Sequence, residues 1–319
     1  MTIREQVLEL KGHIAGNIIG QDDVVTKILI GLLTDGNVLL EGLPGLAKTR
    51  AVKSLASNLD CKLSRIQFTP DLLPSDITGT EIYQPQAEEK FMFQPGPIFS
   101  NLVLADEINR APAKVQSALL EAMEERQVSV AGKTHKMDPL FMVLATQNPV
   151  EQEGTYPLPE AQLDRFIMKI EIGYPSHENE TKIMQLVREE SKGVTKTVQP
   201  IPQSVVFDAR KEIGMVQVKE PAEKYIVDLI TATRYPDQFS KELKRWINYG
   251  ASPRGTISID RCSRVVAWMD GRDYVTPDDI RFIVHDVLRH RLILSYEANA
   301  DGINAGAVID EVLKNVAVA

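Results

Sequence analysis

Three short apolar runs in the first half of the chain end abruptly in polar residues. They are "NVLLE" (37–41), "NLVLADE" (101–107) and "LFMVLATQN" (140–148). Continuous apolar runs of this length are typical of strands that are buried on both faces of a parallel sheet. Helical patterns follow the first two runs, over residues 47–59 and 111–127. Strands that alternate with helices predict right-handed crossovers and a parallel α/β sheet.

The polar ends of these runs are expected to meet at one edge of the sheet. The first run ends at Glu41, the second at Asp106-Glu107 and the third at Gln147-Asn148. In an open parallel sheet, ligands bind in the crevice outside the carboxyl ends of the strands. The sequence therefore predicts one ligand-binding crevice that is lined by all three ends.

The loop after the first run departs at one position from a phosphate-binding loop. The stretch "EGLPGLAKTR" (41–50) fits G-x-x-x-x-G-K-[ST], except that Ala47 replaces the second glycine. Alanine costs about 1–2 kcal/mol in a left-handed conformation, and nothing where φ is negative. Its amide group is kept in either case. Taken alone, the stretch does not separate a phosphate loop from a chance glycine turn, but its place between a strand and a helix favours nucleotide binding.

Four residues of this loop would carry the binding chemistry. Gly42 and Gly45 let backbone N–H groups point inward, and a helix that opens at Lys48 directs the positive end of its dipole at phosphate groups. Lys48 would reach the β- and γ-phosphates, and the Thr49 hydroxyl would hold Mg²⁺. ATP and Mg²⁺ are therefore the expected ligands.

The other two polar ends are assigned to hydrolysis. Opposite a glycine loop, Asp106 would orient the water shell of the metal, and Glu107 would take a proton from the attacking water. Asn148 would fix that water and the γ-phosphate through its amide. In isolation, Asp106-Glu107 would be a solvated strand end, and Asn148 would be a turn initiator before Pro149. For Asn148 both interpretations can hold.

Composition narrows the function classes. The 319 residues are 43% hydrophobic and 25% charged, as in an ordinary globular protein. No apolar run approaches the roughly 20 residues that span a bilayer, and the start "MTIREQVLELKG" lacks a signal-peptide core, so a cytoplasmic protein without membrane insertion is expected. The net charge of −8 disfavours nucleic acid as the main partner. The basic run "KELKRW" (241–246) is more typical of a solvated helix face.

The cysteines and histidines suggest no metal site or disulfide framework. The two cysteines, Cys61 and Cys262, lie far apart in the sequence, and the five histidines lack metal-ligand spacing. We expect both cysteines to be buried thiols. His285 and His290 are expected at the surface of the last helices.

With these motifs in place, the chain is similar to AAA+ ATPases of the MoxR family over nearly its whole length. "GLPGLAKT" (42–49) carries the alanine that this family commonly shows, and residues 102–125 match the family's Walker B stretch. "TPDLLPSDITGTE" (69–81), "ATQNP" (145–149) and "EAQLDRF" (160–166) also match. The resemblance implies a P-loop NTPase AAA+ core, in which helices sandwich a parallel sheet, followed by an all-α lid domain and an ATPase activity.

The resemblance also implies roles that spacing alone does not. "IIGQ" (18–21), otherwise a turn before a helix, is similar to the segment that packs against adenine. Arg165 matches the arginine finger, for which a salt bridge with Asp164 is the alternative, and Arg254 in "ASPRG" (251–255) matches sensor 2 on the lid. The expected nucleotide-binding residues are Ile18, Ile19, Gly20, Gly42, Leu43, Pro44, Gly45, Leu46, Ala47, Lys48, Thr49, Arg50 and Arg254. The expected catalytic residues are Glu107, Lys48, Asn148, Arg165 and Arg254, and the expected metal ligands are Thr49 and Asp106.

Family members carry two hairpin insertions, which the resemblance places near residues 79–96 and at "VSVAGKTHKM" (128–137). In the second stretch the apolar alternation breaks at Gly132-Lys133, as at a hairpin turn. For Phe91 and Phe93, core packing is favoured over a functional role.

The rest of the chain predicts a second, helical domain. A Thr/Pro/Lys-rich stretch, "KGVTKTVQPIP" (192–202), marks the boundary, so we expect a core over residues 1–192 and a lid over residues 193–319. Thr276 and Pro277 are a good helix start, because a hydroxyl cap precedes proline in the first turn. Residues 292–319 are predicted to form a small terminal helix. The other helices are predicted near 203–215, 221–234, 254–269 and 277–291.

The resemblance favours an ATP-driven, chaperone-like machine that remodels protein partners, and it implies a homo-oligomer, with a hexameric ring expected. Members of the family are associated with von Willebrand factor A domain proteins and with maturation of protein complexes, including metal insertion. The alternatives are an ATP-dependent nucleic-acid motor, a magnesium-chelatase-type motor subunit and a nucleotide switch that does not hydrolyse ATP. The acidic charge argues against the nucleic-acid motor, and Glu107 argues against the switch.

Overall fold

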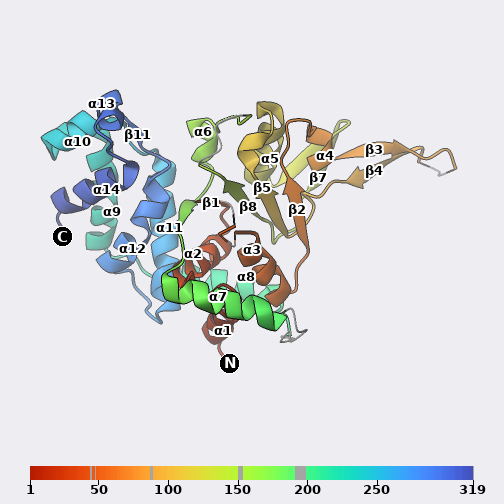
Figure 1. The fold of residues 1–319 in the computed structure, drawn as a ribbon, viewed down its shortest axis with the longest axis horizontal. Coiled ribbons are helices and arrows are strands. Elements are labelled where there is room, and N and C mark those ends of the chain that lie inside the picture. Colours follow the sequence, from red (N-terminus) through yellow and green to blue (C-terminus); the bar gives the residue numbers. More distant parts are fainter. Residues whose placement is uncertain (44, 47, 87–88, 150–153, 191–198, 319) are drawn as a thin grey trace. The chain divides into compact units, whose positions relative to one another are not determined.

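The computed structural model describes residues 1–43, 45–46, 48–86, 89–149, 154–190 and 199–318 (Figure 1). The chain forms two compact units. The first unit comprises Glu5–Leu158 and Ile170–Val205, with Met1. The second unit comprises Pro159–Lys169 and Val206–Ala319, with Thr2–Arg4. The expected linker 192–202 lies partly outside the described residues, so the boundary near residue 192 stays a prediction.

A parallel sheet forms the centre of the first unit. Its strands are β1 (Val38–Gly42), β2 (Leu63–Gln67), β5 (Leu102–Asp106), β8 (Met142–Gln147) and β9 (Met168–Ile172). In the described part of the chain the order is β2-β5-β8-β1-β9, and the pairs β1/β8, β5/β8 and β2/β5 are parallel. The three apolar runs of the sequence are therefore adjacent strands, with β8 between β5 and β1.

Helices cover the sheet because their apolar stripes need a partner surface. The helices of the first unit are α1 (Ile3–Asn17), α2 (Asp22–Leu33), α3 (Lys48–Asn58), α4 (Pro74–Thr78), α5 (Ala113–Glu125) and α7 (His177–Glu190). A short 3₁₀ turn, η1 (Ile108–Arg110), leads from β5 to α5. In Figure 1, α5 lies on one side of the central strands, and α2 and α3 lie on the other. The central strands β5, β8 and β1 are thus buried on both faces, as their continuous apolar runs predict.

Both expected hairpins are present. The first joins β3 (Gly79–Tyr83) to β4 (Phe91–Pro95) and extends away from the sheet (Figure 1). The second joins β6 (Gln127–Val130) to β7 (Lys133–Lys136). Its turn lies at Ala131-Gly132, where both φ angles are positive, as a tight hairpin turn of matching twist requires.

The prediction that Phe91 packs in the core is wrong. Its side chain is 55% exposed, and its ring lies 5.3 Å from that of Tyr83 on the same ribbon. The reason is that this part of the hairpin extends away from the sheet and its helices, as the described residues show in Figure 1. Phe93 instead stacks on His135 of the second hairpin, with ring centroids 3.8 Å apart.

The second unit is helical, as predicted. It contains α6 (Glu160–Leu163), most of α8 (Gln203–Gly214), α9 (Glu220–Arg234), η2 (Pro236–Gln238), α10 (Lys241–Trp246), α11 (Pro253–Met269), α12 (Pro277–Leu288), α13 (Tyr296–Ala300) and α14 (Ala305–Asn315). The sequence did not predict the short antiparallel pair of β10 (Ile247–Tyr249) and β11 (Ile293–Leu294). The tail after residue 292 is therefore β11 and two helices, and not one terminal helix.

Two expectations about single side chains need correction. His290 is 7% exposed, because its Nε2 atom contacts the carbonyl oxygen of Phe166, 3.0 Å away, inside the second unit. Cys262 is buried as expected, but Cys61 is only partly buried, and this burial raises the pKa of the Cys61 thiol to about 11. In the described residues, no helix is both long and apolar enough to cross a membrane.

Candidate functional site

The glycine loop lies between the carboxyl end of β1 and the start of α3. Gly42 has no room for a side chain, because a Cβ atom there would lie 2.9 Å from the carbonyl oxygen of Ile172. Gly45 has a φ of +84°, a left-handed conformation that glycine adopts at no cost. Leu46, next to it, is buried. Pro44 and Ala47, the residue that replaces the second glycine, lie outside the described residues.

Lys48 joins two strand ends. Its Nζ atom donates to the carbonyl oxygen of Gly42 at 2.5 Å and lies 3.5 Å from the carbonyl oxygen of Gln147. Gly42 is the last residue of β1, and Gln147 is the last residue of β8. Thr49, the next residue in the first turn of α3, is partly exposed. The ammonium group therefore lies at the carboxyl edge of the sheet, beside the strand that leads to Asn148.

Asp106 ends β5 and is held by two neighbours. Its Oδ1 atom accepts a hydrogen bond from Thr146 Oγ1 at 2.6 Å. Its Oδ2 atom accepts from Arg65, with distances of 2.6 Å to Nη2 and 3.1 Å to Nε. Arg65 comes from β2, the neighbour of β5 in the sheet. The carboxylate is thus buried and fixed in direction from both adjacent strands.

Glu107 follows directly, with a left-handed backbone (φ +58°). Its N–H donates to Thr146 Oγ1 at 2.8 Å, so that one hydroxyl orients both acidic residues. The Oε2 atom of Glu107 accepts from Gln67 Nε2 at 2.7 Å and lies 3.3 Å from Arg110 Nε. A left-handed conformation in a residue other than glycine is strained, and such strain is concentrated at functional sites.

Asn148 lies just beyond β8 and is buried. Since β8 separates β1 from β5, the structure brings Lys48, Asp106-Glu107 and Asn148 to one edge of the sheet. Sequence reasoning missed Thr146, Arg65 and Gln67. Arg65 and Gln67 could have been found from their place in "LSRIQ" (63–67), which forms β2. In the sheet register, Gln67 of this strand pairs with Asp106.

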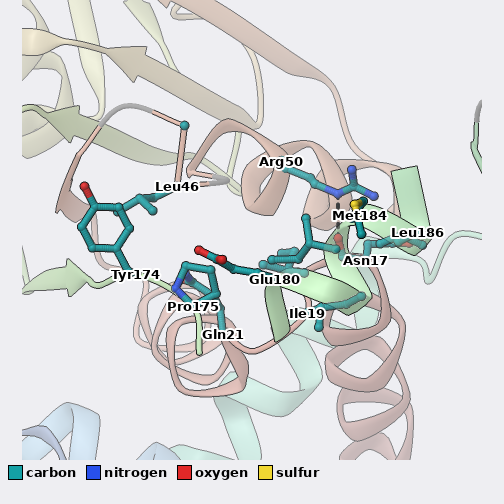
Figure 2. Close-up of a pocket in the computed structure, with 13 residues that line it drawn as sticks. Asn17, Ile19, Gln21, Leu46, Arg50, Tyr174, Pro175, Glu180, Met184 and Leu186 are labelled. Carbon is teal, nitrogen blue, oxygen red and sulfur yellow. Dashed lines mark hydrogen bonds between the residues drawn. The ribbon is translucent and has the colours of Figure 1, made fainter. Parts of the chain in front are cut away.

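A cavity of about 400 Å³ lies beside the glycine loop, within the first unit. Figure 2 shows how its side chains gather from the end of α1 and the turn after it, the glycine loop, the start of α3, and α7 with the two residues Tyr174 and Pro175 that precede it. Arg50 closes one side, where its Nε atom donates to the carbonyl oxygen of Asn17 at 2.7 Å. The lining residues include Ile18, Ile19, Gln21, Gly45, Leu46 and Tyr174. The cavity is mainly apolar and adjoins the candidate phosphate loop, which suits a flat ring system attached to phosphates.

Gly20 lies beside this cavity in a left-handed conformation (φ +77°). A Cβ atom on it would overlap the side chain of Asn179 on α7, at 2.3 Å from Nδ2. Glycine therefore lets the chain between α1 and α2 pass close to α7, which brings Ile18 and Ile19 to the cavity wall.

Arg165 and Arg254 belong to the second unit. Arg165 follows α6, and the neighbouring Asp164 binds Arg291 at 2.8 Å and Ser252 at 2.8 Å. Arg254 lies exposed in the first turn of α11, where its N–H donates to the capping Ser252 Oγ at 3.1 Å. The residues that the structure brings together around Lys48 are those of the first unit.

The donor set at the sheet edge fits Mg²⁺ bound together with phosphates. Within the described residues, no group of three or more His, Cys, Asp and Glu side chains could hold a metal on its own. Mg²⁺ is usually bound through one or two carboxylates, substrate phosphates and water. Asp106 and Thr49 supply hard oxygen donors of this kind, and the phosphates would supply the rest.

Two protein-family models match the chain. The ATPase family associated with various cellular activities (AAA) matches residues 37–168, and the AAA lid domain matches residues 243–312. These matches cover the glycine loop, β5, β8 and Arg165 in the first case, and most of the helical unit, with Arg254, in the second.

Similar proteins extend the match over the whole chain. The protein named Chaperone MoxR1 of Mycobacterium tuberculosis is 47% identical over 325 aligned residues, which cover 99% of this chain and 82% of that protein. Protein MoxR of Methylorubrum extorquens is 32% identical over 91% of this chain and 88% of its own length. A crystal structure from Cytophaga hutchinsonii, of a protein assigned as an ATPase, has a TM-score of 0.92 and 47% identity, covering 99% of this chain and 96% of that one. The chain therefore belongs to the MoxR family of AAA+ ATPases.

Proposed function

We propose that this protein hydrolyses ATP to ADP and phosphate at the carboxyl edge of the sheet and uses the reaction to remodel protein partners. The observation that carries the proposal is the convergence of Lys48, from the glycine loop, with Asp106 and Glu107 at the end of β5. A phosphate-binding cation, a metal-binding carboxylate and a candidate base are the groups that hydrolysis of a nucleoside triphosphate requires.

The residues have separate roles in this proposal. Lys48 and backbone N–H groups of the glycine loop would bind the phosphates, and Thr49 and Asp106 would hold Mg²⁺, which would neutralise phosphate charge. Glu107 takes a proton from the attacking water, while the Asn148 amide orients that water against the γ-phosphate. Because Gln67 donates to Glu107 Oε2 at 2.7 Å, the carboxylate of the base has a defined direction.

The cavity beside the glycine loop is proposed to hold the adenine and ribose. Ile18 and Ile19 supply apolar walls, and Gly20 lets the chain approach α7. The loop residues from Leu43 to Arg50, which include Lys48, would surround the phosphates of the nucleotide. The adenine ring would then lie in an apolar cavity, and the phosphates would lie beside the cationic Lys48.

Arg165 and Arg254 are proposed to complete the reaction in an oligomer. As an arginine finger, Arg165 would enter the site of a neighbouring subunit and meet charge that develops on the γ-phosphoryl oxygens, a task that suits a permanently charged, planar fork of donors. Arg254 would contact the nucleotide of its own subunit from the lid, whose proposed extent is residues 193–319. A hexameric ring is the assembly that we propose.

The clients are proposed to be proteins. The relative in Mycobacterium tuberculosis is named a chaperone, and the net charge of −8 disfavours a nucleic-acid track. We propose a cytoplasmic machine whose partners include von Willebrand factor A domain proteins and whose work includes maturation of complexes that receive a metal. A magnesium-chelatase-type motor or a nucleic-acid motor would use the same nucleotide chemistry with a different client.

The test is phosphate release from ATP by the purified protein, compared with Lys48→Ala, with ATP affinity measured in parallel. We expect the wild type to turn over ATP only with Mg²⁺ present, and Lys48→Ala to lose both tight ATP binding and turnover. Arg245→Lys, on the outer surface of α10, serves as a matched cation control and should keep both. Near-normal ATP affinity in Lys48→Ala would refute the phosphate-loop assignment.

A further inference from the structure

Arg291 is a buried cation that the proposed chemistry does not use. It lies three residues after the end of α12, and its side chain is 1% exposed. Its hydrogen-bond partners Asp164, Phe166, Ile167, Val287 and Ser258 all belong to the second unit. Burying a guanidinium costs free energy unless its N–H groups donate hydrogen bonds. The acceptors of these hydrogen bonds therefore show which segments Arg291 holds together.

Three residues that accept hydrogen bonds from Arg291 flank Arg165 in the sequence. Arg291 Nε donates to Asp164 Oδ1 at 2.8 Å, and Nη2 donates to the carbonyl oxygens of Asp164 at 3.1 Å and Phe166 at 2.7 Å. Nη1 donates to the carbonyl oxygen of Ile167 at 3.2 Å. The guanidinium therefore fixes the main chain immediately before and immediately after the proposed finger.

The same side chain is tied to the lid helices. Nη1 donates to the carbonyl oxygen of Val287 on α12 at 2.5 Å, and Nη2 lies 3.3 Å from Ser258 Oγ on α11. His290 adds a further contact to the same segment, with Nε2 at 3.0 Å from the carbonyl oxygen of Phe166. Burial and the charge of Arg291 lower the pKa of His290 well below its usual value, so the imidazole is neutral beside the cation.

Asp164 connects the segment to the start of α11 as well. Its Oδ2 atom accepts a hydrogen bond from Ser252 Oγ at 2.8 Å. Ser252 is the N-cap of α11, and its Oγ accepts from the N–H of Arg254. One carboxylate is thus shared between the buried guanidinium and the cap of the helix turn that carries Arg254.

From these contacts we infer that Arg291 is a positioning residue for the arginine finger. It binds the main chain around Arg165 to α11 and α12, so that Arg165 and the turn that carries Arg254 form one body. A movement of the lid in one subunit would then move Arg165 of that subunit relative to the nucleotide site of the neighbouring subunit. The inference rests on the proposed function, because it requires Arg165 to act in the site of a neighbour.

The main variant is Arg291→Lys, which keeps a positive charge opposite Asp164 but loses the fork that holds four carbonyl oxygens. Asp164→Asn is the second variant, for use if Arg291→Lys does not fold, as judged by circular dichroism and thermal unfolding. Arg245→Lys is the matched control, because Arg245 also pairs with two carboxylates of the second unit, Glu297 and Asp301. Arg245 makes these pairs at the exposed end of the lid.

We expect kcat for ATP to fall at least about tenfold in Arg291→Lys, with KM for ATP changed less than about twofold, since the variant keeps its own nucleotide site. Arg245→Lys should change neither constant. An unchanged kcat in a folded Arg291→Lys protein that still assembles would overturn the inference.

Mixed oligomers separate a defect in the finger from a defect in the subunit's own site. As reference, Arg165→Ala mixed with Lys48→Ala should recover activity, because some interfaces pair an intact phosphate loop with an intact finger. Arg291→Lys should behave as Arg165→Ala does. Mixed with Lys48→Ala, it should recover ATPase activity. Mixed with Arg165→Ala, it should show no more ATPase activity than the two variants show separately.

The opposite pattern would overturn the inference and leave the proposed function intact. If Arg291→Lys recovered with Arg165→Ala but not with Lys48→Ala, its defect would lie in its own nucleotide site. If the reference mixture itself failed to recover in well-assembled oligomers, the finger role of Arg165 would be wrong, and the positioning role of Arg291 would fall with it.

Discussion

Gly42 and the main chain of Ile172 approach so closely that a Cβ atom on Gly42 would lie 2.9 Å from the carbonyl oxygen of Ile172. The contact joins the end of β1 to the end of β9, at the first residue of the candidate phosphate loop. Glycine is needed here for space, whereas Gly45 is needed for its left-handed φ of +84°.

Gly42→Ala should therefore destabilise the first unit, because either the methyl group or the β9 backbone must move. We expect a loss of about 1–3 kcal/mol, as is usual for overpacking, which thermal unfolding would report as a lower Tm. Gly173→Ala is the matched control, since a Cβ atom there meets nothing within 4 Å. Equal Tm values for the two variants would show that the close approach does not constrain residue 42.

His290 should make the second unit less stable in mild acid. Its folded pKa is well below the usual value near 6.5, so below that pH the unfolded chain binds a proton that the folded chain does not. Stability is then lost as pH falls through 6.5, by at most about 1.4 kcal/mol per pH unit. Urea unfolding between pH 7.5 and 5.5 should show a smaller loss in His290→Gln. Identical pH dependence in the two proteins would contradict a buried neutral imidazole.

If Arg165 acts in a neighbouring subunit, turnover per subunit should rise with protein concentration as oligomers form. A finger supplied in trans can contribute about 10³–10⁵ in turnover, so dilute protein should bind ATP yet hydrolyse it slowly. Phosphate release measured beside the oligomeric state, from light scattering, checks this. A specific activity that stayed constant while the oligomer dissociated would exclude the finger role.

The Glu107→Gln variant should hold protein clients, because it would remain in the ATP-bound state. We expect a defined set of proteins to co-purify with it from the native cell in the presence of ATP, and to be absent with Lys48→Ala. Mass spectrometry of the two samples makes the comparison. Identical sets of proteins would argue against clients that are bound in the ATP state.

Much of the candidate site was predictable because strand ends in a parallel sheet converge. The apolar runs before Lys48, Asp106 and Asn148 predicted strands whose carboxyl ends line one crevice, and the sheet order places these strands side by side, with β8 between β5 and β1. Arg65 and Gln67 were missed, because "LSRIQ" (β2) is not a continuous apolar run, and its link to the acidic residues depends on the register between two strands. Thr146 was missed because one hydroxyl inside an apolar run gives no sequence signal.

The errors concern contacts between residues far apart in the chain. The burial of His290 depends on Phe166, which lies 124 residues earlier, and no local pattern around "VLRHRLIL" reports this. Phe91 looks like a core residue in sequence, but its exposure follows from the absence of a packing layer behind its part of the hairpin. The adenine-binding role proposed for Ile18 and Ile19 rests on the family resemblance, since residues 18–21 alone predict only a turn.

In the proposed function, Glu107 acts as the base in ATP hydrolysis at this sheet edge. The most direct test measures ATP affinity and phosphate release for Glu107→Gln beside the wild type, in protein shown to be assembled. Glutamine keeps the size and the hydrogen bond to Gln67 but cannot take a proton. We predict ATP affinity within a few-fold of the wild type and turnover lower by about 10²–10⁴, the usual loss for a general base. Turnover within a few-fold of the wild type would contradict the account.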